Sequence, residues 1–132
     1  MSFRMTASTA DSAALQAAWR DLAAAHARVS EALEHALQRG HGLSLAEFEV
    51  LQRLVEAPEG HRRMQELAEE IHLSPSALSR LVGRLERTGL AERDICDTDR
   101  RGIYACLTGA GRAAHASAEP THRAVLADTL AR

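Results

Sequence analysis

The chain of 132 residues contains no lysine and no asparagine, few aromatic side chains, three prolines and only two cysteines. Cys96 and Cys106 are too few for the disulfide framework of a small secreted domain, and they fit a reducing compartment as small apolar residues. No apolar run approaches the roughly 20 residues of a membrane span, and the first residues lack the apolar region of a signal peptide. We therefore expect a cytoplasmic protein without a membrane partner.

What the chain does contain is typical of one folded domain, with 45% apolar and 26% charged residues. A chain of this length buries roughly two-thirds of its unfolded surface, which is enough for a core without disulfides or structural metal. This composition excludes collagen, a coiled coil alone and a disordered tail.

The basic residues are all arginine, sixteen of them, against eighteen acidic residues. The net charge of −2 argues at first against nucleic acid as a partner. The charge is uneven, however: residues 1–60 carry five arginines and eight acids, whereas residues 61–112 carry nine arginines and eight acids. Because arginine suits bidentate recognition of phosphate and guanine, the second segment remains a candidate for nucleic-acid binding.

Apolar residues recur at intervals of three and four over residues 11–39, without glycine or proline. This spacing predicts a long amphipathic helix that ends at residues 40–42. A second helix is expected after Ser44, because Glu47 three residues later completes a capping box. It should stop at residues 57–60, which include proline and glycine.

The next segment predicts a short helix over residues 63–71, a tight turn, and a helix that Ser74 caps and Gly89 ends. The period then changes to two, which predicts two short strands, 90–95 and 103–107. Thr108 should cap a helix over 109–118, and Pro120 should interrupt it before a last segment, 121–131. This order is that of a winged helix-turn-helix within a mainly α (α+β) fold.

The helix after Ser74 has two unlike faces when its residues are placed at about 100° intervals. One face is aliphatic, and the other holds serine, glycine and arginine without an acid: Ser76, Ser79, Arg80, Gly83, Arg84 and Arg87. Serine and arginine on one face suit the major groove of DNA, although an ordinary solvated helix face is the alternative. At the hairpin tip, Arg100 and Arg101 suit a minor groove, and a charged turn with internal ion pairs is the alternative there.

Other residues give weaker signals. Seven histidines suggest a metal, but no pair has close ligand spacing, so we expect solvent-exposed histidines and no metal site. Three aromatic residues, Trp19, His26 and Phe48, fit either an effector crevice or the core. The sequence shows no nucleophile–base pair, phosphate-binding glycine loop or paired carboxylates, so we expect neither an enzyme nor a cofactor.

Two runs, LSLAEFEVLQRLVEAP and MQELAEEIHLSPSALSRLVGRLERTGLAERDICDTDRRGIYACLTGAGR, resemble the multiple-antibiotic-resistance-regulator (MarR) family of bacterial transcription factors. The most specific part is Asp99-x-Arg101 followed by Leu107-Thr108, the wing signature of that family. The similarity extends from about Leu15 to the end of the chain.

The resemblance implies a winged-helix homodimer that binds a pseudo-palindromic operator in double-stranded DNA. It assigns Arg101 to the minor groove with Asp99 as its orienting partner, and it places five residues at the major groove: Ser74, Ser76, Ser79, Arg80 and Arg84. A small-molecule effector commonly releases DNA in this family. The first helix lacks the cysteine of the peroxide-sensing branch, and the final helix is expected to be short.

The chain is thus expected to have a flexible N-terminus, 1–10, and one domain, 11–132. Within it, 11–43 and 109–132 would form dimerisation helices, because their apolar stripes exceed what a DNA-binding lobe, 44–108, can cover. We predict a homodimeric repressor that a small molecule releases from DNA. The alternative is a winged-helix module that binds protein and not DNA.

Overall fold

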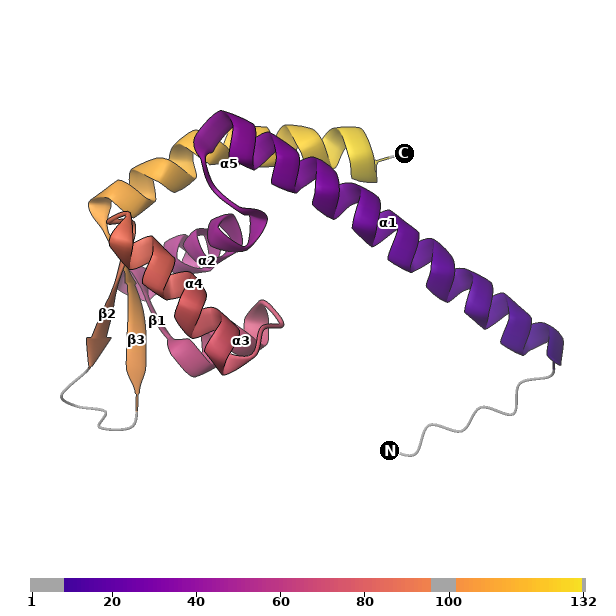
Figure 1. Ribbon diagram of the computed structural model, residues 1–132, viewed down its shortest axis with the longest axis horizontal. Helices are drawn as coiled ribbons and strands as arrows, with labels where there is room; N and C mark the ends of the chain where they lie inside the picture. The colour runs from indigo at the N-terminus through magenta and orange to yellow at the C-terminus, as the bar shows by residue number, and fades with distance from the viewer. Residues whose placement is uncertain (1–8, 96–101, 132) are drawn as a thin grey trace.

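The computed structural model describes residues 9–95 and 102–131. Within these residues the chain forms, in order, α1 (Thr9–His41), α2 (Leu45–Glu56), a 3₁₀ turn η1 (Pro58–Gly60), β1 (His61–Arg63), α3 (Met64–Glu70), α4 (Pro75–Arg87), β2 (Ala91–Ile95), β3 (Ile103–Leu107) and α5 (Gly109–Leu130). Figure 1 shows α1 and α5 crossing one end of the molecule, with the other helices and the sheet forming a lobe beneath them. The mainly helical winged helix-turn-helix expected from the sequence is confirmed.

Local sequence signals account for most helix ends. The Ser44 side chain accepts a hydrogen bond from the Glu47 amide at 3.0 Å, and the Glu47 carboxylate accepts one from the Ser44 amide at 2.9 Å, so the capping box is formed. Ser74 caps α4 by accepting from the Ala77 amide at 3.1 Å. Gly89 ends that helix in the left-handed region, at φ 78°.

The wing has three strands, whereas the sequence pattern predicted two. The additional strand, β1, pairs antiparallel with β3, so that the sheet order is β1-β3-β2. β1 consists of His61, Arg62 and Arg63, three polar residues that show no alternation. It forms a strand because it pairs with Tyr104, Ala105 and Cys106, more than forty residues away along the chain. No local sequence pattern indicates this pairing.

A single aliphatic core joins α2, α3 and α4 and the inner face of the sheet. Its largest fully buried side chains are those of Leu37, which comes from α1, and of Phe48, Leu51, Leu54, Leu67, Leu78, Leu81 and Leu85. Each buried leucine contributes roughly 1.5–3 kcal/mol relative to an exposed one. The core therefore holds α4 by its aliphatic face and leaves the opposite face at the surface.

The expected break at Pro120 is wrong, because α5 continues through this residue as one helix. Proline lacks the N–H for one backbone hydrogen bond and normally kinks a helix. Figure 1 shows α5 changing direction part-way along its length. The helix is maintained by tertiary contacts on both sides of the proline, since Ala118 is buried and the Thr121 hydroxyl bonds to His41 of α1 at 2.8 Å. The final helix is accordingly not short.

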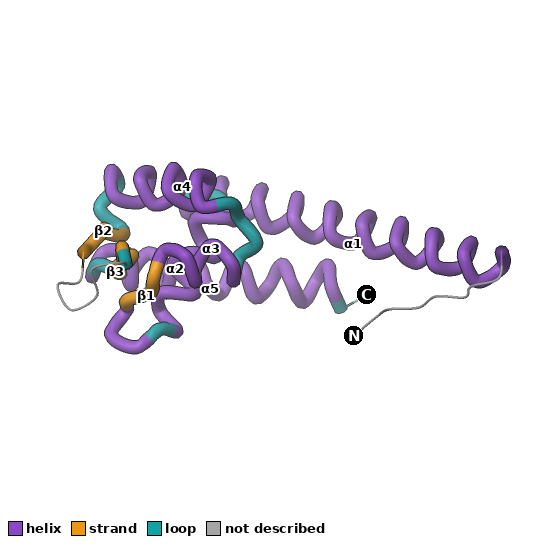
Figure 2. The backbone as a smooth tube through the Cα atoms, turned by 90° about the horizontal axis from the view of Figure 1, so that it is seen from below, coloured by secondary structure: helices purple, strands orange, loops and turns teal. Residues whose placement is uncertain are grey.

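The first half of α1 projects beyond the rest of the molecule in both views (Figures 1 and 2). Its C-terminal part packs on α5, where Leu33 and Leu37 are buried. Trp19 and Leu22, by contrast, are 68% and 64% exposed, and Leu15 is exposed beside them. Among residues 9–95 and 102–131, no helix has the length and apolar character needed to cross a membrane.

Candidate nucleic-acid interface

The two faces of α4 separate as the helical periodicity predicts. Leu78, Leu81, Val82 and Leu85 are buried in the core. The residues on the other side are exposed or half-buried, and they comprise Ser76, Ser79, Arg80, Gly83, Arg84 and Arg87. The outer face therefore presents three arginines and two serines with no carboxylate among them.

Ser74 lies at the N-terminus of this face, where its hydroxyl oxygen already caps the helix. The Ser74 and Ser76 hydroxyls are 3.4 Å apart, so the first turn presents two adjacent hydroxyl groups. The role in capping is confirmed by the structure, and a contact of Ser74 with DNA stays a prediction.

An arginine of the wing joins this face, and sequence reasoning missed it. The Arg93 guanidinium donates from Nη1 to the Ser79 hydroxyl at 3.2 Å and from Nη2 to the Ser79 carbonyl. Its Nε lies 3.0 Å from the Glu86 carboxylate. Strand alternation could have revealed the contact, because Arg93 is two residues from the buried Ala91 and so points to the same side of β2.

Three acidic residues of the lobe, Glu66, Glu69 and Glu70, lie on α3, and an arginine pairs with two of them. Arg62 makes a bidentate pair with Glu70, at 3.1 and 2.6 Å, and its Nη1 lies 3.5 Å from Glu66. The Arg62 guanidinium holds the pKa of the Glu70 carboxyl below its ordinary value. Arg62 is thus engaged within the lobe.

The predicted tip of the wing, Asp99, Arg100 and Arg101, lies outside the described residues, as does Cys96. The strands that lead to this tip are described, and their register is regular. Ile95 pairs with Ile103 and Ala91 with Leu107. The hairpin predicted from the change of period is therefore confirmed up to its last described pair.

Comparison with known proteins gives the same fold. Residues 41–102 match the model of the MarR family. AbsC of Streptomyces coelicolor, a MarR family regulator, is 30% identical and superposes with a TM-score of 0.82, covering 96% of this chain and 82% of that one. The chain belongs to the MarR family.

Two further MarR-family relatives have been solved with DNA. Sco3205 of S. coelicolor, in complex with DNA, is 29% identical with a TM-score of 0.83, covering 98% of this chain and 78% of that one. The repressor Rv2887 of Mycobacterium tuberculosis is 35% identical over 91 residues, which are 69% of this chain and 64% of that protein, or just under two-thirds of its length. Its structure with DNA gives 31% identity and a TM-score of 0.66, covering 84% of this chain and 80% of that one.

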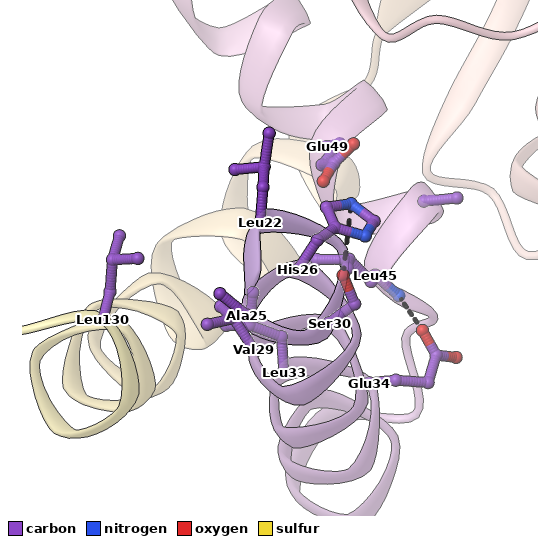
Figure 3. A pocket seen from close by; sticks show the side chains of 11 residues that line it. Leu22, Ala25, His26, Val29, Ser30, Leu33, Glu34, Leu45, Glu49 and Leu130 are labelled. Atoms are coloured by element: carbon purple, nitrogen blue, oxygen red, sulfur yellow. Dashed lines mark hydrogen bonds between the residues drawn. The ribbon is translucent and has the colours of Figure 1, made fainter. Parts of the chain in front are cut away.

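The three residues considered for an effector crevice, Trp19, His26 and Phe48, do not come together. Phe48 is in the core at 1% exposure, whereas Trp19 is exposed on the projecting part of α1. His26 is exposed and lines a groove of about 600 Å³ between α1, α2 and the end of α5 (Figure 3). The alternative, that all three belong to the core, is right for Phe48 alone.

Two histidines that the sequence analysis expected at the surface, His115 and His122, instead stack on Phe48. The His115 ring centroid is 5.1 Å and the His122 centroid 4.4 Å from the phenyl centroid, with interplanar angles of 22° and 17°. His115 is only 5% exposed, and its Nε2 lies 2.7 Å from the Gln52 side-chain oxygen. The two histidines are seven residues, or about two turns, apart on α5, and Phe48 of α2 stacks on both. This contact stabilises the packing of the lobe on α5.

This stack predicts a loss of stability in acid. Burial lowers the pKa of His115, with Glu119 and Glu56 acting in the opposite direction and Arg112 adding to the lowering. Burial and the neighbouring His115 likewise lower the pKa of His122. A histidine whose pKa is lower in the folded state binds fewer protons there than in the unfolded chain. Its stabilising contribution is therefore complete above the ordinary pKa of about 6.5 and is lost as the pH falls through the folded-state pKa.

The measurement is urea unfolding of wild type and His115→Gln between about pH 7.5 and 5.5. Wild type should lose more free energy of unfolding over this interval than the variant, because glutamine keeps an amide donor for Gln52 and does not titrate. His61→Gln, at an exposed position of β1, serves as the control. Equal pH dependence of His115→Gln and wild type would contradict the prediction.

Proposed function

We propose that this protein is a homodimeric transcriptional repressor that binds a pseudo-palindromic operator in double-stranded DNA. The observation that carries the proposal is the outer face of α4, which is rich in serine and arginine, free of acid, and held outward by four buried aliphatic residues. A phosphate backbone attracts such a face, and base edges in the major groove accept hydrogen bonds from it. The solved DNA complexes of two relatives support this choice of partner.

In this proposal each lobe uses two grooves. The first turns of α4 enter the major groove, where Ser76, Ser79, Arg80 and Arg84 reach bases and phosphates, with Arg87 near the backbone. The wing extends to the adjacent minor groove, where Arg101 inserts and Asp99 orients its guanidinium. The net charge of the whole chain does not reveal this arrangement, because acidic side chains among the first 60 residues offset the arginines of the lobe.

The projecting half of α1 supports the homodimer. Leu15, Trp19 and Leu22 follow one another at intervals of four and three, so they form one stripe, which we call the arm stripe. Leu22 also borders the groove of Figure 3, together with Leu130 of α5. A second copy related by two-fold symmetry would cover the arm stripe with its own, and would place the two α4 helices for half-sites about one DNA turn apart.

The same groove supports a response to a small molecule. Its walls come from α1 and α5, which would form the dimer, and from Leu45, Ala46 and Glu49 of α2, which belongs to the lobe. Burial raises the pKa of the Glu49 carboxyl there, which favours its neutral form. An apolar ligand in this groove would contact both parts at once and so alter the distance between the two α4 helices.

Replacing Arg80 or Arg101 with alanine is expected to weaken operator binding while leaving the fold intact. Each change should weaken binding by about 1–3 kcal/mol if the side chain makes a good groove contact. The assay is a gel shift with the DNA upstream of the protein's own gene, or with duplexes that the wild type selects from random DNA. Arg20→Ala, on exposed α1, is the matched control. Unchanged affinity in both test variants would reject the assigned surface.

A salt titration tests the class of partner. Operator affinity should fall steeply as salt rises, because each phosphate contact releases counterions. A winged-helix module that binds protein and not DNA would give no gel shift with the upstream DNA or with duplexes from random DNA.

A further inference from the structure

Arg93 of β2 and Glu86 of α4 join the wing to this helix through several bonds, and we call this set of contacts the wing brace. Besides the guanidinium contacts with Ser79 and Glu86, the Arg93 backbone amide donates to Glu86 Oε2 at 3.2 Å. Ser79 and Glu86 are seven residues apart, or about two turns of the helix, so a single Arg93 guanidinium links two turns of α4. The brace thus reaches from the C-terminal turn of α4 to its middle.

Among the residues that the structure describes, the other hydrogen bonds between the end of α4 and the wing are at the base of the wing. The Leu90 amide donates to the Leu85 carbonyl at 2.8 Å, and the Thr108 hydroxyl donates to the Gly89 carbonyl at 2.7 Å. Buried Ala91 and Ala105 pack the sheet on the core that it shares with α4, but apolar packing does not fix an angle by itself. Arg93 supplies a directional attachment further along α4 than the hydrogen bonds at the base.

Gly83 makes room for the brace. A Cβ at this position would lie 3.3 Å from Nη2 of Arg93 and 3.8 Å from Nη1 of Arg87. Glycine is otherwise unfavourable inside a helix. Its presence on the outer face of α4, between Ser79 and Arg87, allows the guanidinium to lie close against the helix.

We propose that Arg93, held by Glu86, is a positioning residue that sets the angle between α4 and the wing, and thereby the offset between the major-groove and minor-groove contacts of one lobe. The inference rests on the proposed DNA-binding function and deepens it. A rigid offset matters because a helix and a wing that enter adjacent grooves must satisfy both at once. The brace does this before DNA is bound, so the cost of ordering the wing is avoided at binding.

A direct contact of Arg93 with phosphate is the competing role, and it predicts the opposite effect at Glu86. If Arg93 bound phosphate, Glu86→Gln would free the guanidinium and remove a negative charge near DNA, and binding would strengthen. If Arg93 is a brace, the same change breaks an ion pair that fixes the wing, and binding weakens. The sign of the Glu86→Gln effect therefore decides between the two roles.

The experiment measures affinity and salt dependence for a duplex that wild-type protein selects from random DNA. Glu86→Gln and Arg93→Ala should each weaken binding about tenfold, and the double variant should be no weaker than Arg93→Ala alone, because both changes break the same brace. The slope of log affinity against log salt should stay unchanged in Arg93→Ala, whereas loss of a phosphate contact would reduce it by about one. Arg93→Lys should behave like alanine, since lysine cannot supply the guanidinium fork. Arg123→Ala, which breaks an exposed Arg–Glu pair on α5, is the matched control and should bind as wild type.

Gly83→Ala provides a variant whose folding is not in question, because alanine favours the helix. It should keep or raise the melting temperature but weaken DNA binding, and it should have no further effect when Arg93 is already alanine. Tighter binding of Glu86→Gln, a reduced salt slope in Arg93→Ala, or a Gly83→Ala effect that persists without Arg93 would each overturn the brace. Failure of wild type to bind any selected duplex would instead reject the proposed function.

Discussion

Replacing Leu22 with glutamate is expected to separate the two protomers and to lower operator affinity by a factor of about 10²–10⁴. Leu22 is 64% exposed in the single chain and lies on the arm stripe with Leu15 and Trp19. In the proposed dimer a carboxylate there would be buried against an apolar partner surface, which is strongly unfavourable. Once the protomers separate, each lobe binds one half-site alone, and the gain from the second, linked half-site is lost.

The matched control is Ala24→Glu, which adds the same charge to the same helix on the side opposite the arm stripe. Both variants are measured by light scattering for mass, by circular dichroism for helix content and by gel shift. Trp19 is the only tryptophan, so its emission also reports whether the arm stripe is covered. A Leu22→Glu protein that remains dimeric with wild-type affinity would refute the arm stripe as the dimer surface.

Replacing Gly111 with alanine is expected to destabilise the lobe by about 2–3 kcal/mol and to displace the wing. A Cβ at this position would lie 2.0 Å from the Leu90 carbonyl oxygen and 2.9 Å from Cδ1 of Leu107. The Leu90 carbonyl cannot simply turn away, because it accepts a hydrogen bond from the Thr108 amide at 3.3 Å. The first turn of α5 must therefore move away from the beginning of β2.

Gly109→Ala is the control for this prediction, because it adds the same methyl group to the same first turn of α5. Beyond its own turn of helix, no described residue lies within 4 Å of a Cβ at Gly109, so this change should leave stability unchanged or raise it slightly. Urea unfolding gives the free energies, and a gel shift gives the effect on the operator. The prediction fails if the two alanine variants are equally stable.

Sequence reasoning succeeded where the determining interactions are short-range. The capping box at Ser44 and Glu47, the Ser74 cap and the left-handed Gly89 involve residues within a few positions of one another. The inward face of α4 follows in the same way from a period of 3.6. Such signals determined the order of the helices and the outer face of α4, and so led to the proposed partner.

Sequence reasoning failed where the stabilising contact comes from a distant segment. Local chemistry predicts a break at Pro120, but burial of neighbouring residues and the bond from Thr121 to His41 keep α5 helical. β1 has no strand pattern of its own and exists because β3 pairs with it. The two histidines expected at the surface are stacked on Phe48 because α2 and α5 pack together.

The sequence alone therefore determined most helix boundaries, the winged helix-turn-helix order and which side of α4 faces outward. Only the tertiary structure decided that Arg93 is attached to that face, that Gly83 makes room for it and that the arm stripe remains uncovered. The physical reason is the range of the forces involved. Caps and periodicity act within one or two turns of the chain, whereas the angle between α4 and the wing depends on packing and hydrogen bonds between separate elements.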